Sequence, residues 1–171
     1  MRKLFYRGPS SAVLHAEYAA RGRIDTEAPV TSASSVVVDA TPAQVWEVIS
    51  DLRNWPRWAP GYEVLQLGET VPGATFRWRL GGVRITSRFA VVAPGRELTW
   101  SGVVLGYKAV DQQQLEALPG GRTRVTMRES LAGPLVSLIF GADRLRAGHE
   151  RYLAALETEL AGRPAAHRHV R

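Results

Sequence analysis

Short apolar runs separated by turn residues fill the middle of the chain. Large apolar residues alternate with polar ones within each run, which is the period of strands with one buried face. The separators are glycines and Pro-Gly pairs, and their spacing is too short for the crossovers that parallel strands need. A strand starting at Val30 and ending at Val38 therefore leads to an antiparallel meander of six strands: Tyr62–Leu67, Thr75–Leu80, Val83–Val92, Glu97–Val104, Tyr107–Ala117 and Arg122–Leu131.

Helical periodicity occurs on both sides of this meander. Thr41 caps a helix that starts at Pro42 and ends near Asp51, and residues 54–61 form a short helical turn anchored by two tryptophans. After Pro134 the pattern predicts one long helix as far as Gly162. Its apolar face comprises Leu135, Leu138, Ala142, Leu145, His149, Leu153, Leu156 and Leu160.

The ends of the chain differ from this central part. Residues 1–29 form an N-terminal extension with a short helix, N-capped by Ser11 and stopped by Gly22, which lies across the main domain or across a partner subunit. A homodimer through this extension is one prediction. Residues 30–162 form the ligand-binding domain, and residues 163–171 form a basic, flexible tail.

The order of elements predicts an α+β fold. A curved antiparallel sheet of about seven strands must cover its apolar face, and the long C-terminal helix has the matching apolar stripe. Two short helices follow the first strand. We expect a pocket between the sheet and the long helix.

Composition narrows the classes of protein. A length of 171 residues suits one domain, and the lack of cysteine excludes disulfides, thiolate zinc sites and cysteine nucleophiles. The formal charge of +6 comes mainly from arginines spread along the chain, so we expect no nucleic-acid partner. Neither an export signal nor a membrane span is predicted, and the expected location is the cytoplasm.

Several segments resemble one known superfamily. They are Val36–Asp51 with the following Trp55-Pro56-Arg57-Trp58, then Pro94–Trp100, Gly121–Thr126 and Glu129–Leu135. Together they resemble the START-like helix-grip superfamily (SRPBCC proteins), in its polyketide cyclase/dehydrase and lipid-transport branch. The resemblance covers about residues 30–162 and implies a helix-grip fold with an internal cavity for hydrophobic or aromatic molecules. Some such proteins are aromatase/cyclases, and others carry lipids or quinones without chemistry.

Strand parity assigns polar side chains to the cavity face. The predicted ligand-binding residues are Trp78, Ser87, Phe89, Trp100, Tyr107, Gln113, Met127 and Tyr152. Asp111 and Gln113 share this face, but a shift of one residue would turn both toward solvent. Tyr152 lies at the edge of the apolar stripe of the long helix. The alternative to its contacting the ligand is that it is an aromatic residue at the rim of the pocket.

Three residues are the catalytic candidates. His149 lies in the apolar stripe of the last helix, and histidine suits proton transfer near neutral pH. Glu129 lies on a buried strand face, where a carboxyl group suits acid or base chemistry, and Asp111 faces the same side. The alternatives are a core histidine with satisfied hydrogen bonds and a structural carboxylate bonded to the backbone or an arginine.

No cofactor or metal is predicted. The chain lacks a glycine-rich phosphate loop, a nucleophile elbow and the second histidine of a zinc-protease helix, and its His167-x-His169 pair belongs to the tail. Together with the family resemblance, which implies the reaction class, this predicts a cofactor-independent cyclase or dehydratase acting on a hydrophobic or polyketide-like ligand. The alternatives are a non-catalytic carrier or sensor of a lipid or quinone-like molecule and, on charge alone, a nucleic-acid module.

Overall fold

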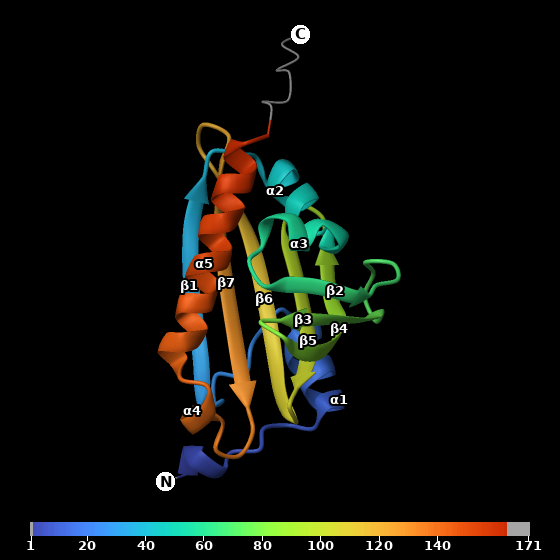
Figure 1. Ribbon diagram of the computed structural model, residues 1–171, viewed down its shortest axis with the longest axis vertical. Coiled ribbons are helices and arrows are strands. Elements are labelled where there is room, and N and C mark those ends of the chain that lie inside the picture. The colour runs from blue at the N-terminus through green and yellow to red at the C-terminus, as the bar shows by residue number, and fades with distance from the viewer. Residues whose placement is uncertain (1, 164–171) are drawn as a thin grey trace.

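The computed structural model describes residues 2–163 and shows a single curved antiparallel sheet (Figure 1). Its seven strands lie in the order β1-β7-β6-β5-β4-β3-β2. Their bounds are β1 Val30–Val38, β2 Tyr62–Gln66, β3 Thr75–Leu80, β4 Val83–Ala93, β5 Glu97–Val104, β6 Tyr107–Leu118 and β7 Arg122–Ala132. The predicted meander is confirmed, because its strand ends differ from the predicted ones by a residue at most.

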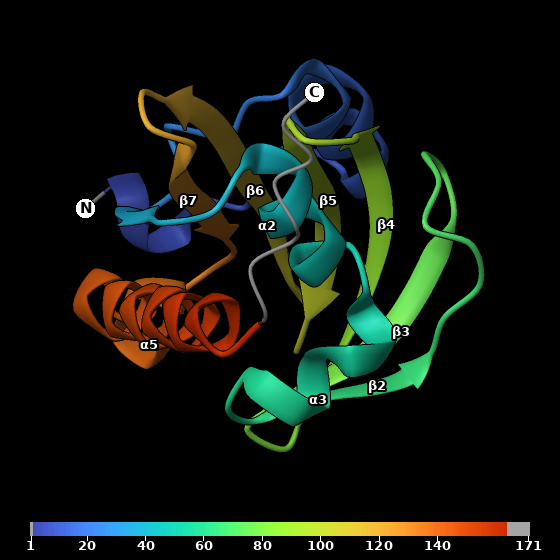
Figure 2. The same cartoon turned by 90° about the horizontal axis from the view of Figure 1, so that it is seen from above.

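The sheet curls so that its concave face encloses the core (Figure 2). Bulges shift the register in β2 between Val64 and Gln66 and in β4 between Phe89 and Val91. Such bulges increase the local bend and twist of a strand. Both lie outside the stretches of β6 and β7 where the predicted polar residues occur, so the predicted parity of Asp111 and Glu129 holds.

Two short helices lie within the curve, as predicted. Helix α2 (Pro42–Ile49) begins at Thr41, whose hydroxyl accepts from the backbone of Gln44 in a capping box. Helix α3 (Trp55–Trp58) follows a 3₁₀ turn and buries Trp55 completely. These helices place aromatic side chains against the concave face of the sheet.

The predicted long helix is wrong in its first part. Helix α4 (Val136–Ile139) ends at Phe140, whose backbone is extended, and α5 (Ala142–Ala161) starts anew after Gly141. Leu138 is 71% exposed and does not join the apolar stripe. The helical spacing of apolar residues in the sequence continues across Phe140 and Gly141, but the chain changes direction at these two residues. Helix α5 buries His149, Tyr152, Leu153 and Leu156 toward the sheet.

The N-terminal segment packs on the outer face of its own sheet. Helix α1 (Ser11–Val13) continues as a π-helix to Tyr18, and the left-handed Gly22 ends the helical stretch as predicted. The N-cap is Ser10 instead of Ser11. Leu14 and Ala19 form a small core with Val110 of β6, on the side of the sheet away from α5 (Figure 2).

This packing covers polar strand residues as well. Gln112 of β6 is fully buried and donates to the carbonyl of Gly22, and Ser101 of β5 is hydrogen-bonded to His15. Of the predicted tail, residues 164–171 lie outside the described part of the chain, together with His167 and His169. No helix in residues 2–163 has the length and apolar character needed to cross a bilayer.

Candidate functional site

A cavity of about 330 Å³ lies between α5 and the concave face of the sheet. Its walls come from β3 to β7, from the start of β2 and from α5. Seven of the predicted site residues line it: Trp78, Ser87, Trp100, Asp111, Glu129, His149 and Tyr152. A cavity of this size suits a small molecule. The structure thus brings all three catalytic candidates to one cavity.

Sheet register and helix phase create the polar end of this cavity. Asp111 of β6 and Glu129 of β7 are direct cross-strand partners, so both side chains leave the same face of the sheet. His149 reaches them from α5, and its apolar neighbours on the same stripe, Leu153 and Leu156, fix the rotation of the helix. A titratable atom from each of the three lies within 4.8 Å of the others.

His149 and Glu129 are hydrogen-bonded. His149 Nε2 lies 3.0 Å from Glu129 Oε2, and the two side chains are 5% and 18% exposed. In the tautomer with its proton on Nε2, the imidazole donates to the carboxylate. His149 Nδ1 is buried with no partner in the described residues. Glu129 is thus paired with a histidine and not with an arginine, and a histidine–carboxylate pair can hold or transfer one proton.

Asp111, unlike Glu129, has no hydrogen-bonded side-chain partner among the described residues. Its Oδ1 is buried and accepts no hydrogen bond from residues 2–163. Burial, and then the nearby Glu129 carboxylate, raise the pKa of Asp111 well above the usual aspartate range. The two carboxyl groups thus have different surroundings although they are neighbours, which is a pattern found in acid–base sites.

Aromatic rings form the wall next to this polar end, where Trp100 is the cross-strand partner of Asp111. Tyr62 stacks on Trp78 with ring centroids 5.2 Å apart, and Trp78 meets Trp100 edge to face at 6.5 Å. Trp78 Nε1 donates to Ser87 Oγ at 3.0 Å, so the indole keeps its polar edge satisfied in the wall. Burial raises the pKa of the Tyr62 hydroxyl, which keeps this wall uncharged.

A glycine helps to keep the cavity open at Ser87. Gly102 of β5 is the cross-strand partner of Ser87 and also lines the cavity. A Cβ at Gly102 would lie 2.9 Å from Ser87 Oγ. Any other residue there would displace the serine hydroxyl and narrow the cavity.

Four predicted ligand-binding residues do not line the cavity. Phe89 and Met127 have the predicted facing but fill the closed core, 0% and 1% exposed. Gln113 lies behind Tyr152, whose hydroxyl donates to Gln113 Oε1 at 3.3 Å. Tyr107 packs edge to face against Phe140. Parity predicts the face of a residue, but the depth of the cavity along each strand depends on the helices above it.

Other lining residues were missed. Tyr62 at the start of β2 and Phe140 between α4 and α5 both border the cavity, and so do Arg144 and Arg151 of α5. Tyr62 lies at a strand end next to a loop, so no alternation could assign its facing. Phe140 and Arg144 depend on the break between the two helices, which the helical periodicity concealed.

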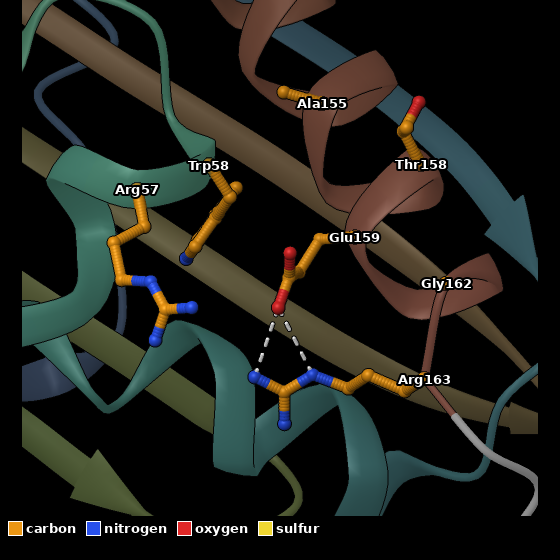
Figure 3. Close-up of a pocket in the computed structure, with 7 residues that line it drawn as sticks. All are labelled: Arg57, Trp58, Ala155, Thr158, Glu159, Gly162 and Arg163. Carbon is orange, nitrogen blue, oxygen red and sulfur yellow. Dashed lines mark hydrogen bonds and ion pairs between the residues drawn. The ribbon is translucent and has the colours of Figure 1, made fainter.

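A second hollow lies on the surface between α3 and the end of α5 (Figure 3). Its volume is about 480 Å³, and Trp58 and Ala155 give it apolar surface while Arg57, Glu159 and Arg163 surround it. Glu159 is occupied by its own helix neighbour, because Arg163 donates twice to its carboxylate at 3.1 Å. None of the predicted site residues lines this hollow.

The three polar residues are also the ones that could hold a divalent ion, although the sequence predicted no metal. Ligands around a small divalent ion lie about 3.3 Å apart when each bond is about 2.1 Å. His149 Nε2 forms the hydrogen bond to Glu129, so a metal ion bound through this atom would have to replace that hydrogen bond. The geometry present is that of a proton-sharing pair beside a second carboxyl group.

Comparison with known proteins gives the family. The model of the family described as polyketide cyclase / dehydrase and lipid transport matches residues 29–161, and the chain belongs to this family. An uncharacterized protein of Mycobacterium tuberculosis is 28% identical over 122 residues, which cover 66% of this chain and 73% of the relative.

Solved structures share the fold. A START superfamily protein from Mycobacterium smegmatis has a TM-score of 0.62 at 15% identity, covering 77% of this chain and 97% of the other. A protein from Chromobacterium violaceum gives 0.66 at 16% identity, with the same coverage. DynU16, a putative protein of the dynemicin biosynthetic locus, gives 0.64 at 22%, covering 77% of this chain and 47% of DynU16. At these identities the likeness concerns the helix-grip fold alone.

Proposed function

We propose that the protein binds a hydrophobic or aromatic, polyketide-like small molecule in the cavity and catalyses its cyclisation or dehydration without a cofactor. The observation that carries the proposal is the hydrogen-bonded His149–Glu129 pair, which opens with Asp111 into an aromatic-walled cavity. Family membership supports a hydrophobic ligand. The fold is also that of DynU16, a protein of a biosynthetic locus.

The His149–Glu129 pair supplies the acid–base chemistry. Ring closure of a chain with several carbonyl groups removes a proton from a carbon between two carbonyls, and the attacked carbonyl oxygen becomes a hydroxyl. A later loss of water removes a second proton, from the carbon next to the one that carries the hydroxyl, and places a proton on that hydroxyl as it leaves. A pair that accepts the first proton and returns one serves both steps, and such transfer contributes about 10²- to 10⁴-fold in rate. Asp111 faces the same space and orients the ligand.

The rest of the cavity confines the substrate. Trp78 and Trp100 provide flat apolar surface on which a planar ligand can lie, and Tyr152 contributes its ring, because its hydroxyl is bonded to Gln113. Holding a flexible chain close to its cyclised shape lowers the entropic barrier of ring closure. The protein therefore needs little covalent chemistry of its own.

A carrier or sensor of a lipid or quinone-like ligand is the second candidate. The observation favouring it is that His149 Nε2 and Glu129 Oε2 are hydrogen-bonded to each other, as they would be in a purely structural pair. In that case the polar end fixes a head group and no proton moves. The family description includes lipid transport beside cyclases, so both roles occur among its members.

The test begins with native mass spectrometry of gently purified protein, followed by denaturing extraction of any bound molecule. The extracted compound, or its linear precursor, is then assayed with His149→Asn and Glu129→Gln, with Glu150→Gln on the exposed side of α5 as control. The enzyme proposal predicts that the two site variants bind the compound but lose turnover at least 100-fold. Equal behaviour of all variants, with the compound unchanged, would establish the carrier.

A further inference from the structure

The inner, polar end of the cavity holds two carboxyl groups that no lysine or arginine of the described residues contacts. Asp111 and Glu129 lie opposite each other on β6 and β7, and no lysine or arginine of residues 2–163 forms an ion pair with either. Glu129 has His149 as its partner, whereas Asp111 Oδ1 is buried and has none in that range. A buried carboxylate oxygen of this kind is unfavourable unless a donor or a positive charge reaches it.

The arginines of the cavity do not supply that charge. Arg144 and Arg151 line it from the exposed side of α5. The Arg144 guanidinium lies over the Phe140 ring, 5.6 Å from its centroid, and neither arginine is within ion-pair distance of Asp111 or Glu129. The two arginines therefore place positive charge at the rim of the cavity. The two carboxyl groups lie at its inner end, which is the polar end described above.

The walls beside these carboxyl groups are aromatic. Tyr62, Trp78 and Trp100 border the same cavity, and indole and phenol faces attract cations that come within about 6 Å. The volume of about 330 Å³ accommodates one or two fused rings with a short side chain. An acceptor without a partner, a second carboxylate and aromatic faces together form a site for an organic cation.

We propose that the cavity selects ligands with a protonated amine next to an aromatic or apolar body, the amine donating to Asp111 Oδ1 and the body lying against Trp78 and Trp100. This inference rests on the proposed function, because it names the chemical class of molecule that the hydrophobic cavity takes. It excludes a ligand that presents a carboxylate to the inner end.

Asp111 can act as the counter-ion of such a ligand through proton exchange. Burial and Glu129 raise the pKa of Asp111, which favours the protonated carboxyl group when no cation is beside it. An ammonium group brings its own positive charge to the same place and allows the carboxyl group to ionise. The Asp111 proton is released to solvent as the ammonium group binds, so the site exchanges one positive charge for another.

The test uses three probes of nearly equal shape: 2-naphthylmethylamine, 2-naphthylmethanol and 2-naphthoate. Their dissociation constants are measured by isothermal titration calorimetry at neutral pH on the full-length protein. We expect the amine to bind about tenfold or more tightly than the alcohol, and the carboxylate to bind least. In Asp111→Asn the amine should lose this preference to within about twofold, while Glu150→Gln on the exposed face of α5 should retain it.

The outcomes separate this inference from the proposed function. Equal binding of the amine and the alcohol, or tightest binding of the carboxylate, would overturn the inference and leave a hydrophobic cavity in place. An amine preference that survives in Asp111→Asn would also overturn it. If that variant does not fold, Asp111→Ser takes its place and must likewise bring the preference for the amine to within about twofold. Binding of none of the three probes would contradict both the inference and the hydrophobic cavity itself.

Discussion

His149 Nε2 on α5 lies 3.0 Å from Glu129 Oε2 on β7, and this bond joins the C-terminal helix to the sheet at the polar end of the cavity. Both side chains are largely buried, and each gives the other a hydrogen bond in place of the water that burial removes. The bond therefore contributes to folding as well as to the proposed chemistry, and the two contributions can be measured separately.

The first prediction concerns this bond in the folded protein. His149→Asn and Glu129→Gln should each lower the free energy of unfolding by about 1–3 kcal/mol, because each variant leaves a buried polar partner behind. The double variant should lose at least about 0.5 kcal/mol less than the sum of the single losses. Urea denaturation followed by circular dichroism measures all four proteins, and strictly additive losses would show that the pair is not coupled.

The second prediction is that Asp111→Asn stabilises the protein at neutral pH. The folded-state pKa of Asp111 is raised, so its contribution to stability is complete below the unfolded pKa and is lost as the pH rises through the folded pKa. Asparagine has nearly the same shape and does not ionise. The gain in the free energy of unfolding should therefore be larger at about pH 8 than at about pH 4.

Thermal unfolding of both proteins across this pH range provides the measurement. A variant that is less stable than the parent protein at every pH would contradict the raised pKa. Glu116→Gln is a suitable control, because Glu116 is exposed and pairs with Arg124 on the outer face. Its stability should follow that of the parent protein within about 0.5 kcal/mol.

The third prediction concerns the hydroxyl of Tyr152. It donates to Gln113 Oε1 at 3.3 Å in a buried position, so Tyr152→Phe should lower the free energy of unfolding by about 1 kcal/mol. Affinity for a naphthalene probe should stay within about twofold, since the ring remains in the wall. Tyr107→Phe is the matched control, because the Tyr107 hydroxyl has no hydrogen bond within residues 2–163. A large loss of affinity in Tyr152→Phe would instead place the hydroxyl on the ligand.

The fourth prediction concerns the N-terminal segment. Leu14 is 2% exposed against the outer face of the sheet, whereas its neighbour Val13 is 45% exposed. Leu14→Ala should lower the free energy of unfolding by about 2 kcal/mol or more, and Val13→Ala by about 0.5 kcal/mol at most. Equal effects of the two substitutions in urea denaturation would mean that the segment does not pack on β6 in solution.

The sequence predicted the strands well, and also the face of the sheet on which each side chain lies, because both follow from the two-residue alternation of apolar and polar residues. Alternation around Met127 and Leu131 placed Glu129 on the inner face, and alternation along the preceding strand placed Asp111 there too, although their direct pairing is a result of the structure. The capped helix at Thr41 likewise depends on neighbouring residues alone. These features do not require knowledge of how distant segments pack.

The predictions that failed depended on contacts between segments that are far apart in the sequence. The predicted apolar stripe that joined Leu138 to His149 ran through Phe140, whose backbone is extended, and so the prediction missed the separate helix that brings Phe140 to the cavity. Phe89 has the facing of a wall residue, yet α2 and α3 close the core above it. The outer-face burial of Gln112 depends on a segment ninety positions earlier in the chain. No local pattern carries that information.

The central claim is that an aromatic ligand lies in the cavity between α5 and the sheet. A crystal structure of the protein soaked with 2-naphthylmethylamine tests it most directly. The account predicts electron density for the rings against Trp78 and Trp100, with the amine within hydrogen-bond distance of Asp111 Oδ1. Density confined to the surface hollow at Trp58 and Glu159, or an empty cavity at saturating probe, would contradict it.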